Sequence, residues 1–231
     1  LQLAGKGAHL ALSDVDAVGL AETKALVDAS GVRCTTHYLD VADREAFFEY
    51  ARQVAAEHGE VHAVFNNAGV TLLDSVENQS YEDFNWLMNI NFWGVVHGTT
   101  AFLPYLKQVD EAHIINISSV FGVMAVPMQS AYNASKFAVR GFTEALKMEM
   151  AGSHIRVSSI HPGGIKTGIA RNSRVNEKTV GVSQHEFHAD FDKLARTTAD
   201  QAAAIIIRGV LKNKRRIMVG TDAKIMSLVT R

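Results

Sequence analysis

The chain has 231 residues, of which 47% are hydrophobic and 20% are charged, so it can bury the core of one sizeable domain. Its 23 lysine and arginine residues nearly balance its 24 aspartate and glutamate residues, and the formal net charge of −1 argues against a protein that binds nucleic acid or a membrane surface. Cys34 is the only cysteine, which excludes an intrachain disulfide and favours a reducing cytoplasm, and no apolar run reaches the ~18 residues of a membrane span.

Short apolar runs alternate with longer segments of helical spacing along the chain. Such runs predict buried strands at Ala8–Ser13, Arg33–Leu39, Val61–Phe65, His113–Ile117, Ile155–Ile160 and Ile217–Val219. Helices are predicted over Val15–Ala29, over Arg44–His58 and from Tyr132 to about Met150, and two more begin at the capping patterns Ser80-x-x-Asp83 and Thr198-x-x-Gln201. Apolar strands that alternate with helices predict a parallel sheet covered on both faces, whose ligands bind beyond the carboxyl ends of the strands.

Two aspartates follow the first two predicted strands. In a dinucleotide-binding fold, Asp14 could accept both hydroxyls of the adenine ribose and repel a 2′-phosphate, although an aspartate here could equally cap the next helix. Asp40 and Val41 follow the second strand, where the carboxylate could reach the adenine edge or could simply form a turn. The residues alone leave both alternatives open.

Small residues follow the third predicted strand, in the sequence Asn66-Asn67-Ala68-Gly69. Glycine and alanine let the backbone approach a bulky ligand closely, and asparagine side chains can tie neighbouring strand ends together. The position at the end of a buried strand favours a cofactor wall over a bare turn.

Tyr132 and Lys136 carry the most specific chemical signal, because a spacing of four residues places both side chains on one face of a helix. A phenol with a pKa of about 10 exchanges a proton poorly near neutrality, and a neighbouring ammonium favours the phenolate. An incidental surface pair would explain one such match by itself. Ser118 and Ser119 close the preceding predicted strand, however, and a hydroxyl there can bind the same substrate oxygen.

Five motifs together resemble the short-chain dehydrogenase/reductase family, over Leu1 to about Thr221. They are Asn66-Asn67-Ala68-Gly69, Asn91-Phe92-Trp93-Gly94, Ile117-Ser118-Ser119, Tyr132-x-x-x-Lys136 and Pro162-Gly163-Gly164-Ile165-Lys166-Thr167. Each motif is weak alone, but their order and spacing are specific. The resemblance implies a Rossmann-like, doubly wound parallel sheet in a single three-layer α/β/α domain spanning residues 1–231.

The resemblance also implies an oxidoreductase that transfers a hydride between a nicotinamide and an alcohol or carbonyl. Tyr132 would be the general acid/base, Lys136 would lower the pKa of Tyr132 and hold the nicotinamide ribose, and Ser119 would polarise the carbonyl. Asn91 would support a water that relays protons through Lys136. Donors aimed at the oxygen on which charge develops lower the barrier to such a transfer.

NAD is the cofactor that the resemblance implies, with NADP less favoured, because no arginine stands beside Asp14 to accept a 2′-phosphate. Ile165 through its backbone and Thr167 through its hydroxyl would hold the nicotinamide carboxamide. The full set implied in cofactor binding is Asp14, Asp40, Val41, Asn67, Ala68, Gly69, Tyr132, Lys136, Pro162, Gly163, Ile165 and Thr167. No metal ion is expected, and His185 and His188 fall in a segment that the family uses as a substrate lid.

Two further segments complete the expected organisation. The family's glycine-rich phosphate loop and the strand before it are expected to precede Leu1, and that strand would lie between Ala8–Ser13 and Val61–Phe65. The polar stretch at about 168–196 is expected to be irregular and to form a mobile substrate lid.

The sequence indicates the substrate only by class. The residues from Val120 to Met128, which follow the serine motif, are largely apolar and favour a lipophilic alcohol or ketone over a sugar or an acid. Two other functions remain open: a non-catalytic, dinucleotide-binding regulatory protein on the same fold, and a lyase or epimerase. We expect a cytoplasmic homo-oligomer, a dimer or tetramer, that binds a small alcohol or carbonyl rather than nucleic acid or membrane.

Overall fold

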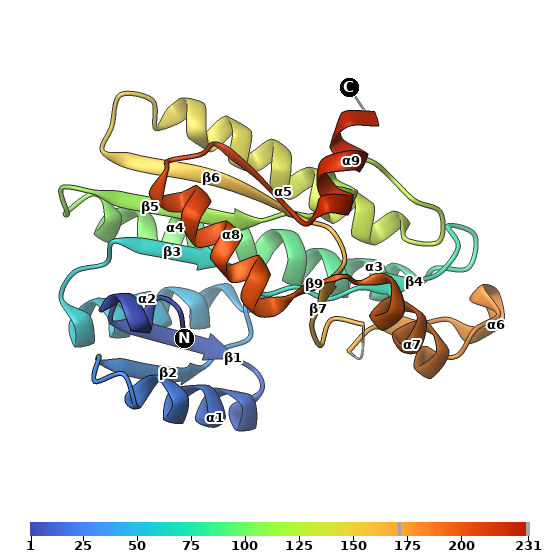
Figure 1. Cartoon of the computed structure of the whole chain (residues 1–231), viewed down its shortest axis with the longest axis horizontal. Helices are drawn as coiled ribbons and strands as arrows, with labels where there is room; N and C mark the ends of the chain where they lie inside the picture. Colours follow the sequence, from blue (N-terminus) through green and yellow to red (C-terminus); the bar gives the residue numbers. More distant parts are fainter. Residues whose placement is uncertain (171, 230–231) are drawn as a thin grey trace.

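Parallel strands flanked by helices form the protein in the computed structural model, which describes residues 1–170 and 172–229 (Figure 1). The strands are β1 (Leu10–Asp14), β2 (Cys34–Tyr38), β3 (Ala63–Asn66), β4 (Leu72–Leu73), β5 (Ala112–Ile117), β6 (Ile155–Pro162), β7 (Ile165–Lys166), β8 (Arg174–Val175), β9 (Thr197–Thr198) and β10 (Arg216–Val219). The α-helices are α1 (Ala17–Asp28), α2 (Arg44–His58), α3 (Tyr81–Met88), α4 (Gly94–Leu106), α5 (Ser130–Glu149), α6 (Glu177–Val180), α7 (Gln184–Leu194), α8 (Ala199–Leu211) and α9 (Thr221–Val229). Shorter turns are the 3₁₀ turns η1 (Ala4–Lys6) and η3 (Val120–Gly122) and the π-helical turn η2 (Asn89–Trp93).

The longer strands form two parallel sheets. Four of them pair in the order β10-β6-β5-β3, and β1 pairs with β2. Within the described residues, β1 pairs only with β2, and β3 pairs only with β5.

The register of these strands aligns their carboxyl ends. Asn66 at the end of β3 lies opposite Asn116 of β5, and Val219 at the end of β10 lies opposite Pro162 of β6. The loops that follow all four strands therefore begin along one edge of the sheet. This is the edge at which parallel α/β sheets bind ligands.

Neighbouring residues of β5 show why helices cover both faces. Ile114 and Ile115 are both fully buried, but Ile114 packs in a cluster with α2, α4 and α5, whereas Ile115 packs in a cluster with α8. Successive side chains of a strand point to opposite faces, so both faces need cover. In Figure 1, α8 crosses the near face of the sheet and α4 and α5 lie behind it. The predicted three-layer, Rossmann-like α/β/α fold is therefore confirmed.

The predicted long strands and helices are found within two residues at each end. The helix α2 coincides with its prediction because the Asp43 side chain caps its first turn. The helix α1 begins later than the predicted Val15, because Asp16 accepts hydrogen bonds from the first turn and acts as the N-cap. The reciprocal capping box of Thr198 and Gln201 is present at the start of α8.

The predicted lid segment is more regular than the sequence analysis expected. Instead of an irregular stretch at 168–196, the structure shows β8, α6 and α7, and Arg171 within that range lies outside the described residues. Ser183 and Glu186 form a reciprocal capping box at the start of α7. The same kind of pattern predicted the helix after Thr198, so the signal was present in the sequence. The prediction failed because the polar composition of the segment was given more weight than its capping pattern.

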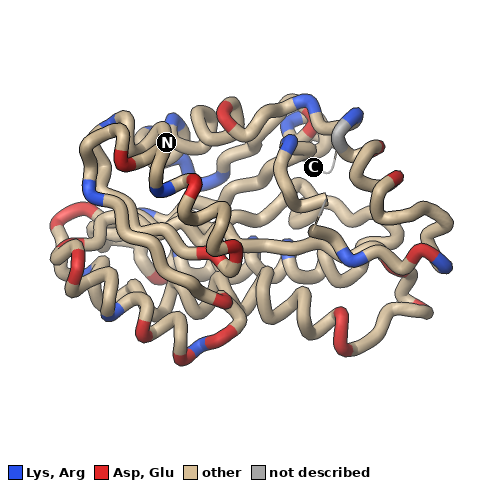
Figure 2. Tube along the Cα trace, turned by 90° about the horizontal axis from the view of Figure 1, so that it is seen from below, with Lys and Arg blue, Asp and Glu red and all other residues tan. Residues whose placement is uncertain are grey.

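Charges of both signs are distributed over the surface. Figure 2 shows lysine and arginine positions interspersed with aspartate and glutamate positions, without an extended block of one sign in this view. Across residues 1–170 and 172–229, every helix is too short or too polar to cross a membrane. In the same part of the chain, no group of three or more histidine, cysteine, aspartate or glutamate side chains is arranged to hold a metal ion.

Candidate active site

A buried chain of hydrogen bonds fixes the carboxyl ends of β3 and β5. Asn66 donates through Nδ2 to Asn116 Oδ1 at 2.8 Å, and Asn116 Nδ2 donates to Thr143 Oγ1 of α5 at 3.0 Å. All three side chains are buried. Asn66 thus makes the predicted tie between strand ends. Through Thr143, the tie also anchors the middle of α5, the helix that carries Tyr132.

Tyr132 and Lys136 lie one turn apart on α5 and are only 9% and 3% exposed. Lys136 Nζ lies 5.7 Å from the centroid of the Tyr132 ring and donates a hydrogen bond to the Ile117 carbonyl at 3.1 Å. No carboxylate of the described residues forms an ion pair with this ammonium. Burial lowers the pKa of Lys136 to about 8. A buried cation without a counter-ion is energetically costly, and such groups concentrate at functional sites.

The pKa of Tyr132 shifts in the direction opposite to the sequence prediction. Burial raises it above the ordinary value of 10.0, and the neighbouring Ser119 side chain opposes that rise only in part. The Lys136 ammonium, 5.7 Å from the centroid of the ring, does not reverse the effect of burial. In this structure, Tyr132 is therefore a neutral phenol at neutral pH, and so a proton donor.

Ser119 lies two residues after the end of β5, and both its hydroxyl oxygen and its carbonyl oxygen accept hydrogen bonds. The hydroxyl oxygen accepts a hydrogen bond from Phe121 N at 3.1 Å. The carbonyl lies 3.0 Å from His161 Nδ1 of β6, while His161 Nε2 lies 2.9 Å from Ser159 Oγ. Because a carbonyl can only accept, Nδ1 carries the proton and Nε2 accepts from the Ser159 hydroxyl. Burial lowers the pKa of His161 to about 4, so this imidazole is neutral at neutral pH.

Asn91 is fully buried in η2, and π-helical turns of this kind are frequent at functional sites. Its Oδ1 accepts from Val70 N at 2.8 Å, and its Nδ2 donates to Val70 O at 2.9 Å and to Ser135 Oγ at 3.1 Å. Ser135 in turn donates to the Tyr132 carbonyl at 2.8 Å. The Asn91 side chain therefore ties the turn after β3 to the first turn of α5.

Gly69 provides space where these side chains converge. A Cβ atom at this position would lie 3.3 Å from Asn91 Oδ1 and 3.3 Å from Lys136 Nζ, closer than most such contacts in proteins. Asn67 and Ala68, just before it, are exposed. The structure thus brings Gly69 of the predicted cofactor wall next to Lys136 and leaves Asn67 and Ala68 at the surface.

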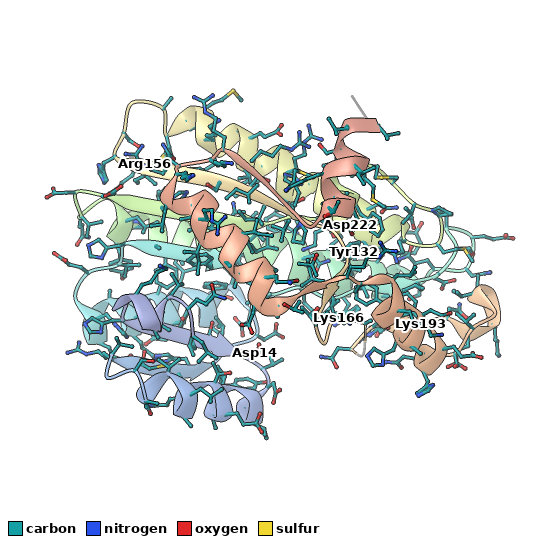
Figure 3. The ribbon with its side chains drawn as sticks, in the orientation of Figure 1. Asp14, Tyr132, Arg156, Lys166, Lys193 and Asp222 are labelled. Carbon is teal, nitrogen blue, oxygen red and sulfur yellow. The ribbon has the colours of Figure 1, made fainter. Side chains whose placement is uncertain are left out.

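The loop after β6 brings the second set of predicted cofactor residues to the same edge of the sheet. Pro162 and Gly163 are half-buried, Ile165 of β7 is buried and pairs with Thr197 of β9, and Thr167 is exposed. In the view of Figure 3, Lys166 of this loop lies between Tyr132 and Asp14. In this view, the loop therefore projects between the two ends of the predicted site.

Asp14 lies at the carboxyl end of β1, apart from Tyr132 (Figure 3). Its side chain is exposed, and its Oδ1 accepts a hydrogen bond from Asp16 N at 3.1 Å. Asp16 rather than Asp14 caps the following helix, since it accepts the hydrogen bonds of the first turn. The helix-cap alternative for Asp14 is therefore wrong, and the dinucleotide alternative remains.

Asp40 and Val41 follow β2 and are held mainly through local contacts. Asp40 is exposed, and its Oδ1 accepts from Ala42 N at 2.9 Å, as in an ordinary turn. The Val41 carbonyl accepts a hydrogen bond from His97 Nδ1 at 3.1 Å. These contacts agree with the turn alternative for Asp40.

Apolar side chains surround the Tyr132 ring. The cluster contains Val70, Leu72, Phe84, Trp86, Leu87, Phe121, Ala131 and Ile169. Phe121 meets the Tyr132 ring edge to face, with the centroids 6.3 Å apart. Ile169 comes from the predicted lid segment, so that segment packs against the surroundings of the phenol.

Sequence reasoning did not identify Ser135, His161 or Asp222. Ser135 lies within the Tyr132-x-x-x-Lys136 motif, and its spacing of three residues from Tyr132 could have indicated a contact within the same turn. His161 directly precedes the loop motif that begins at Pro162. Asp222 binds Gly164 N at 2.7 Å across 58 residues of sequence, so no local pattern indicates it.

Comparisons with known proteins agree with this arrangement. The family model described as short chain dehydrogenase matches residues 1–178. The Mycobacterium tuberculosis protein SadH, whose name provisionally classes it as an oxidoreductase, is 47% identical over 234 residues, covering 100% of this chain and 84% of its own length. The 3-ketodihydrosphingosine reductase of Bacteroides thetaiotaomicron is 39% identical over 152 residues, covering 66% of this chain and 55% of that protein. The crystal structure of a short chain dehydrogenase/reductase from Burkholderia phymatum in complex with NAD has a TM-score of 0.88 and 28% identity, covering 98% of this chain and 85% of that one.

Proposed function

Because this chain belongs to the short-chain dehydrogenase/reductase family and is an oxidoreductase of CH–OH and carbonyl groups, we propose that it is NAD(H)-dependent and acts on a lipophilic alcohol or ketone. A bound nicotinamide would supply or accept the hydride. The accompanying proton transfer is the task of the protein's own side chains. The structural support for the proposal concerns this proton transfer.

One observation carries the proposal. Lys136 is buried beside Tyr132 with a hydrogen bond to a carbonyl, and no carboxylate of the described residues is paired with it. Burying a lysine in this way costs free energy, and a purely structural position gains nothing from the charge. Negative charge that develops on the neighbouring phenol oxygen would be stabilised by it. No feature of the described residues favours the non-catalytic alternative.

We assign the proton-transfer step to Tyr132. In carbonyl reduction, the neutral Tyr132 hydroxyl donates its proton to the substrate oxygen, while the Ser119 hydroxyl donates a hydrogen bond to the same oxygen. Lys136 stabilises the phenolate that remains. In alcohol oxidation, the same groups act in reverse. Because burial raises the pKa of Tyr132, the phenol holds its proton at neutral pH, which is the form that carbonyl reduction requires, and its proton release depends on stabilisation of the phenolate by Lys136.

We assign supporting roles to Asn91 and Ser135. By holding both backbone groups of Val70 and the Ser135 hydroxyl, Asn91 keeps the first turn of α5 in place beside the turn after β3. A water supported at Asn91 would give Lys136 a path for exchanging its proton with solvent. Such a path is needed, since Lys136 is only 3% exposed.

The donor and acceptor groups along the strand ends fit a dinucleotide. The exposed Asp14 carboxylate at the end of β1 can accept ribose hydroxyls and would repel a 2′-phosphate, which supports NAD over NADP. Gly69 leaves room beside Lys136, whose ammonium could bind the hydroxyls of the nicotinamide ribose. The adenine half would contact Asp40, Val41, Asn67 and Ala68, and the carboxamide end would contact Pro162, Gly163, Ile165 and Thr167.

The surroundings of Tyr132 support a lipophilic substrate. Phe121 and Ile169, the latter from the predicted lid, both belong to the apolar cluster around the phenol. Charged groups of a sugar acid or amino acid would lose their hydration there without a partner. The relative from Bacteroides thetaiotaomicron, which is named for a ketosphingosine, supports the ketone class.

The test is a substrate panel with the purified protein. NADH or NADPH is combined with ketones and aldehydes of increasing chain length, and NAD with the corresponding alcohols, and the near-ultraviolet absorbance of the reduced nicotinamide is followed. We expect NADH consumption that increases with the apolar surface of the ketone. Tight NADH binding without turnover of any substrate would instead support the non-catalytic alternative.

We also propose that the protein is a cytoplasmic homo-oligomer. Trp93 and Phe137 leave 47% and 41% of their surface exposed, which supports an interface between copies of the chain. Sedimentation of the purified protein tests this, and a monomer at all concentrations would contradict it.

A further inference from the structure

Asp222 lies in the first turn of α9, and its carboxylate reaches across to the loop after β6. Its Oδ2 accepts a hydrogen bond from Gly164 N at 2.7 Å. Gly163 N donates to the Val219 carbonyl at 2.9 Å, so the ends of β6 and β10 also meet through the backbone. Because Gly164 directly precedes Ile165, the carboxylate holds the start of the segment that carries the predicted carboxamide-binding residues.

Glycines shape the space around this carboxylate. A Cβ atom at Gly163 would collide with Asp222 Oδ2, and a Cβ atom at Gly220 would collide with Oδ1. Gly220 also has a φ of 101°, in the left-handed region that favours glycine. A Cβ atom at Gly164 would lie 3.2 Å from Ala195 Cα, at the end of the predicted lid. The backbone therefore fits closely around the carboxylate on several sides.

We propose that Asp222 is a positioning residue for cofactor binding. By holding Gly164, it fixes the loop so that the Ile165 backbone and the Thr167 hydroxyl are placed to meet the nicotinamide carboxamide. This inference rests on the proposed function. In the view of Figure 3, Asp222 projects on the side of Tyr132 rather than on the side of Asp14.

The energetic argument is one of preorganisation. A hydrogen bond from a backbone N–H to a carboxylate is stronger than one between neutral groups. Without it, the loop would have to be ordered when the cofactor binds, and that ordering costs conformational entropy. The cost would affect only ligands that use this loop. A ligand that occupies the adenine end alone, at β1 and β2, would bind as before.

The test compares two ligands in one variant. The dissociation constants of NADH and of ADP-ribose, which lacks the nicotinamide, are measured by calorimetry for the wild-type protein and for Asp222→Ala. We expect NADH to bind about tenfold more weakly to the variant, the effect of losing one charge-assisted hydrogen bond, and ADP-ribose to bind within about twofold of the wild type. Asp222→Asn should restore NADH binding, because its amide oxygen can accept the same hydrogen bond. Asp200→Ala, which removes an acidic residue from the first turn of α8, is the matched control and should change neither constant.

Gly163→Ala provides a second variant if Asp222→Ala does not fold. Its added methyl group displaces the carboxylate, so it too should weaken NADH binding and spare ADP-ribose. Equal affinities of wild type and variants for NADH would overturn the inference, as would a loss of NADH and ADP-ribose affinity to the same extent. A wild-type protein that binds neither NADH nor NADPH would instead refute the proposed function, and the inference with it.

Discussion

His161 Nδ1 donates a hydrogen bond to the Ser119 carbonyl at 3.0 Å, joining β6 to the turn that follows β5. The imidazole is fully buried, and its Nε2 accepts from the Ser159 hydroxyl at 2.9 Å. Ser119 carries the hydroxyl to which we assign substrate binding. Its placement therefore depends on a neutral histidine that does not itself touch the Tyr132 ring in the described contacts.

We expect His161→Leu to lower kcat for carbonyl reduction about tenfold, with the dissociation constant of NADH unchanged. Leucine retains apolar bulk but leaves the Ser119 carbonyl and the Ser159 hydroxyl without this partner, which costs about 1–3 kcal/mol for each buried group. Steady-state kinetics and calorimetry measure the two effects. His62→Leu is the control, since the His62 side chain is 60% exposed. A folded His161→Leu protein with wild-type kcat would rule out the positioning role.

Acid should destabilise the fold through two buried histidines. Burial lowers the pKa of His113 and of His161 to about 4, from the ordinary value of 6.5. The unfolded chain takes up these protons near pH 6.5, so between pH 6.5 and about 4 it binds more protons than the folded chain, and the free energy of unfolding falls as the pH falls. Across the whole window, the loss is of the order of 3 kcal/mol for each histidine.

Urea unfolding at a series of pH values across this window measures that loss. The free energy of unfolding of His161→Leu should depend less steeply on pH than that of the wild type, because the variant retains only one of the two titrating histidines. Carboxylates also titrate at the acid end, so the difference between the two proteins is the informative quantity. If the free energy of unfolding changed with pH by the same amount in both proteins, the result would contradict a neutral, buried His161 in the folded state.

The pH profile of kcat/KM for carbonyl reduction should decline above about pH 8, where Lys136 loses its proton. This quantity reports groups of the free enzyme. Because burial raises the pKa of Tyr132, the phenol keeps its proton to higher pH and is not the first group to titrate. In Lys136→Arg, the charge persists, so any residual activity should lack this decline. A wild-type profile that stays flat from about pH 7 to pH 10 would contradict the role of Lys136.

Asp14 should make the protein prefer NAD over NADP by at least about tenfold in kcat/KM, because its carboxylate repels the added phosphate. The double substitution Ser13→Arg with Asp14→Ala should narrow that preference. Asp28→Ala, at the other end of α1, removes an exposed carboxylate and should leave the preference unchanged. Comparable efficiency of the wild type with both cofactors would contradict the assignment.

Features of the fold and the site that depend on short-range sequence patterns could be predicted from the sequence. The period of the apolar runs predicted the strands, and the spacing of Tyr132 and Lys136 predicted their common helix face. The helix cap was not predicted correctly, since only Asp14 was considered and Asp16, a residue of the same type two positions later, was overlooked. Only the structure shows that Asp16 accepts the hydrogen bonds of the first turn.

Properties that depend on distant contacts could not be predicted in this way. The spacing of Tyr132 and Lys136 says nothing of the Ile117 carbonyl, which binds the ammonium, or of the burial that raises the phenol's pKa. The contact of Asp222 with Gly164 is likewise formed only when β10 pairs with β6. The helix α7 is different, because its local capping pattern of Ser183 and Glu186 would have been sufficient to predict it, but the polar composition of the segment led to the wrong prediction of an irregular stretch.

The turnover of Tyr132→Phe tests the central claim most directly. This substitution removes only the phenol oxygen and keeps the ring in its apolar cluster, so the fold and NADH affinity should be retained. Tyr81→Phe is the matched control, since Tyr81 is 89% exposed. We expect kcat of Tyr132→Phe to fall by about 10²–10⁴-fold, the usual contribution of general acid/base catalysis, while Tyr81→Phe remains at the wild-type rate. A Tyr132→Phe protein that keeps more than about a tenth of wild-type turnover would contradict the assignment of proton transfer to Tyr132.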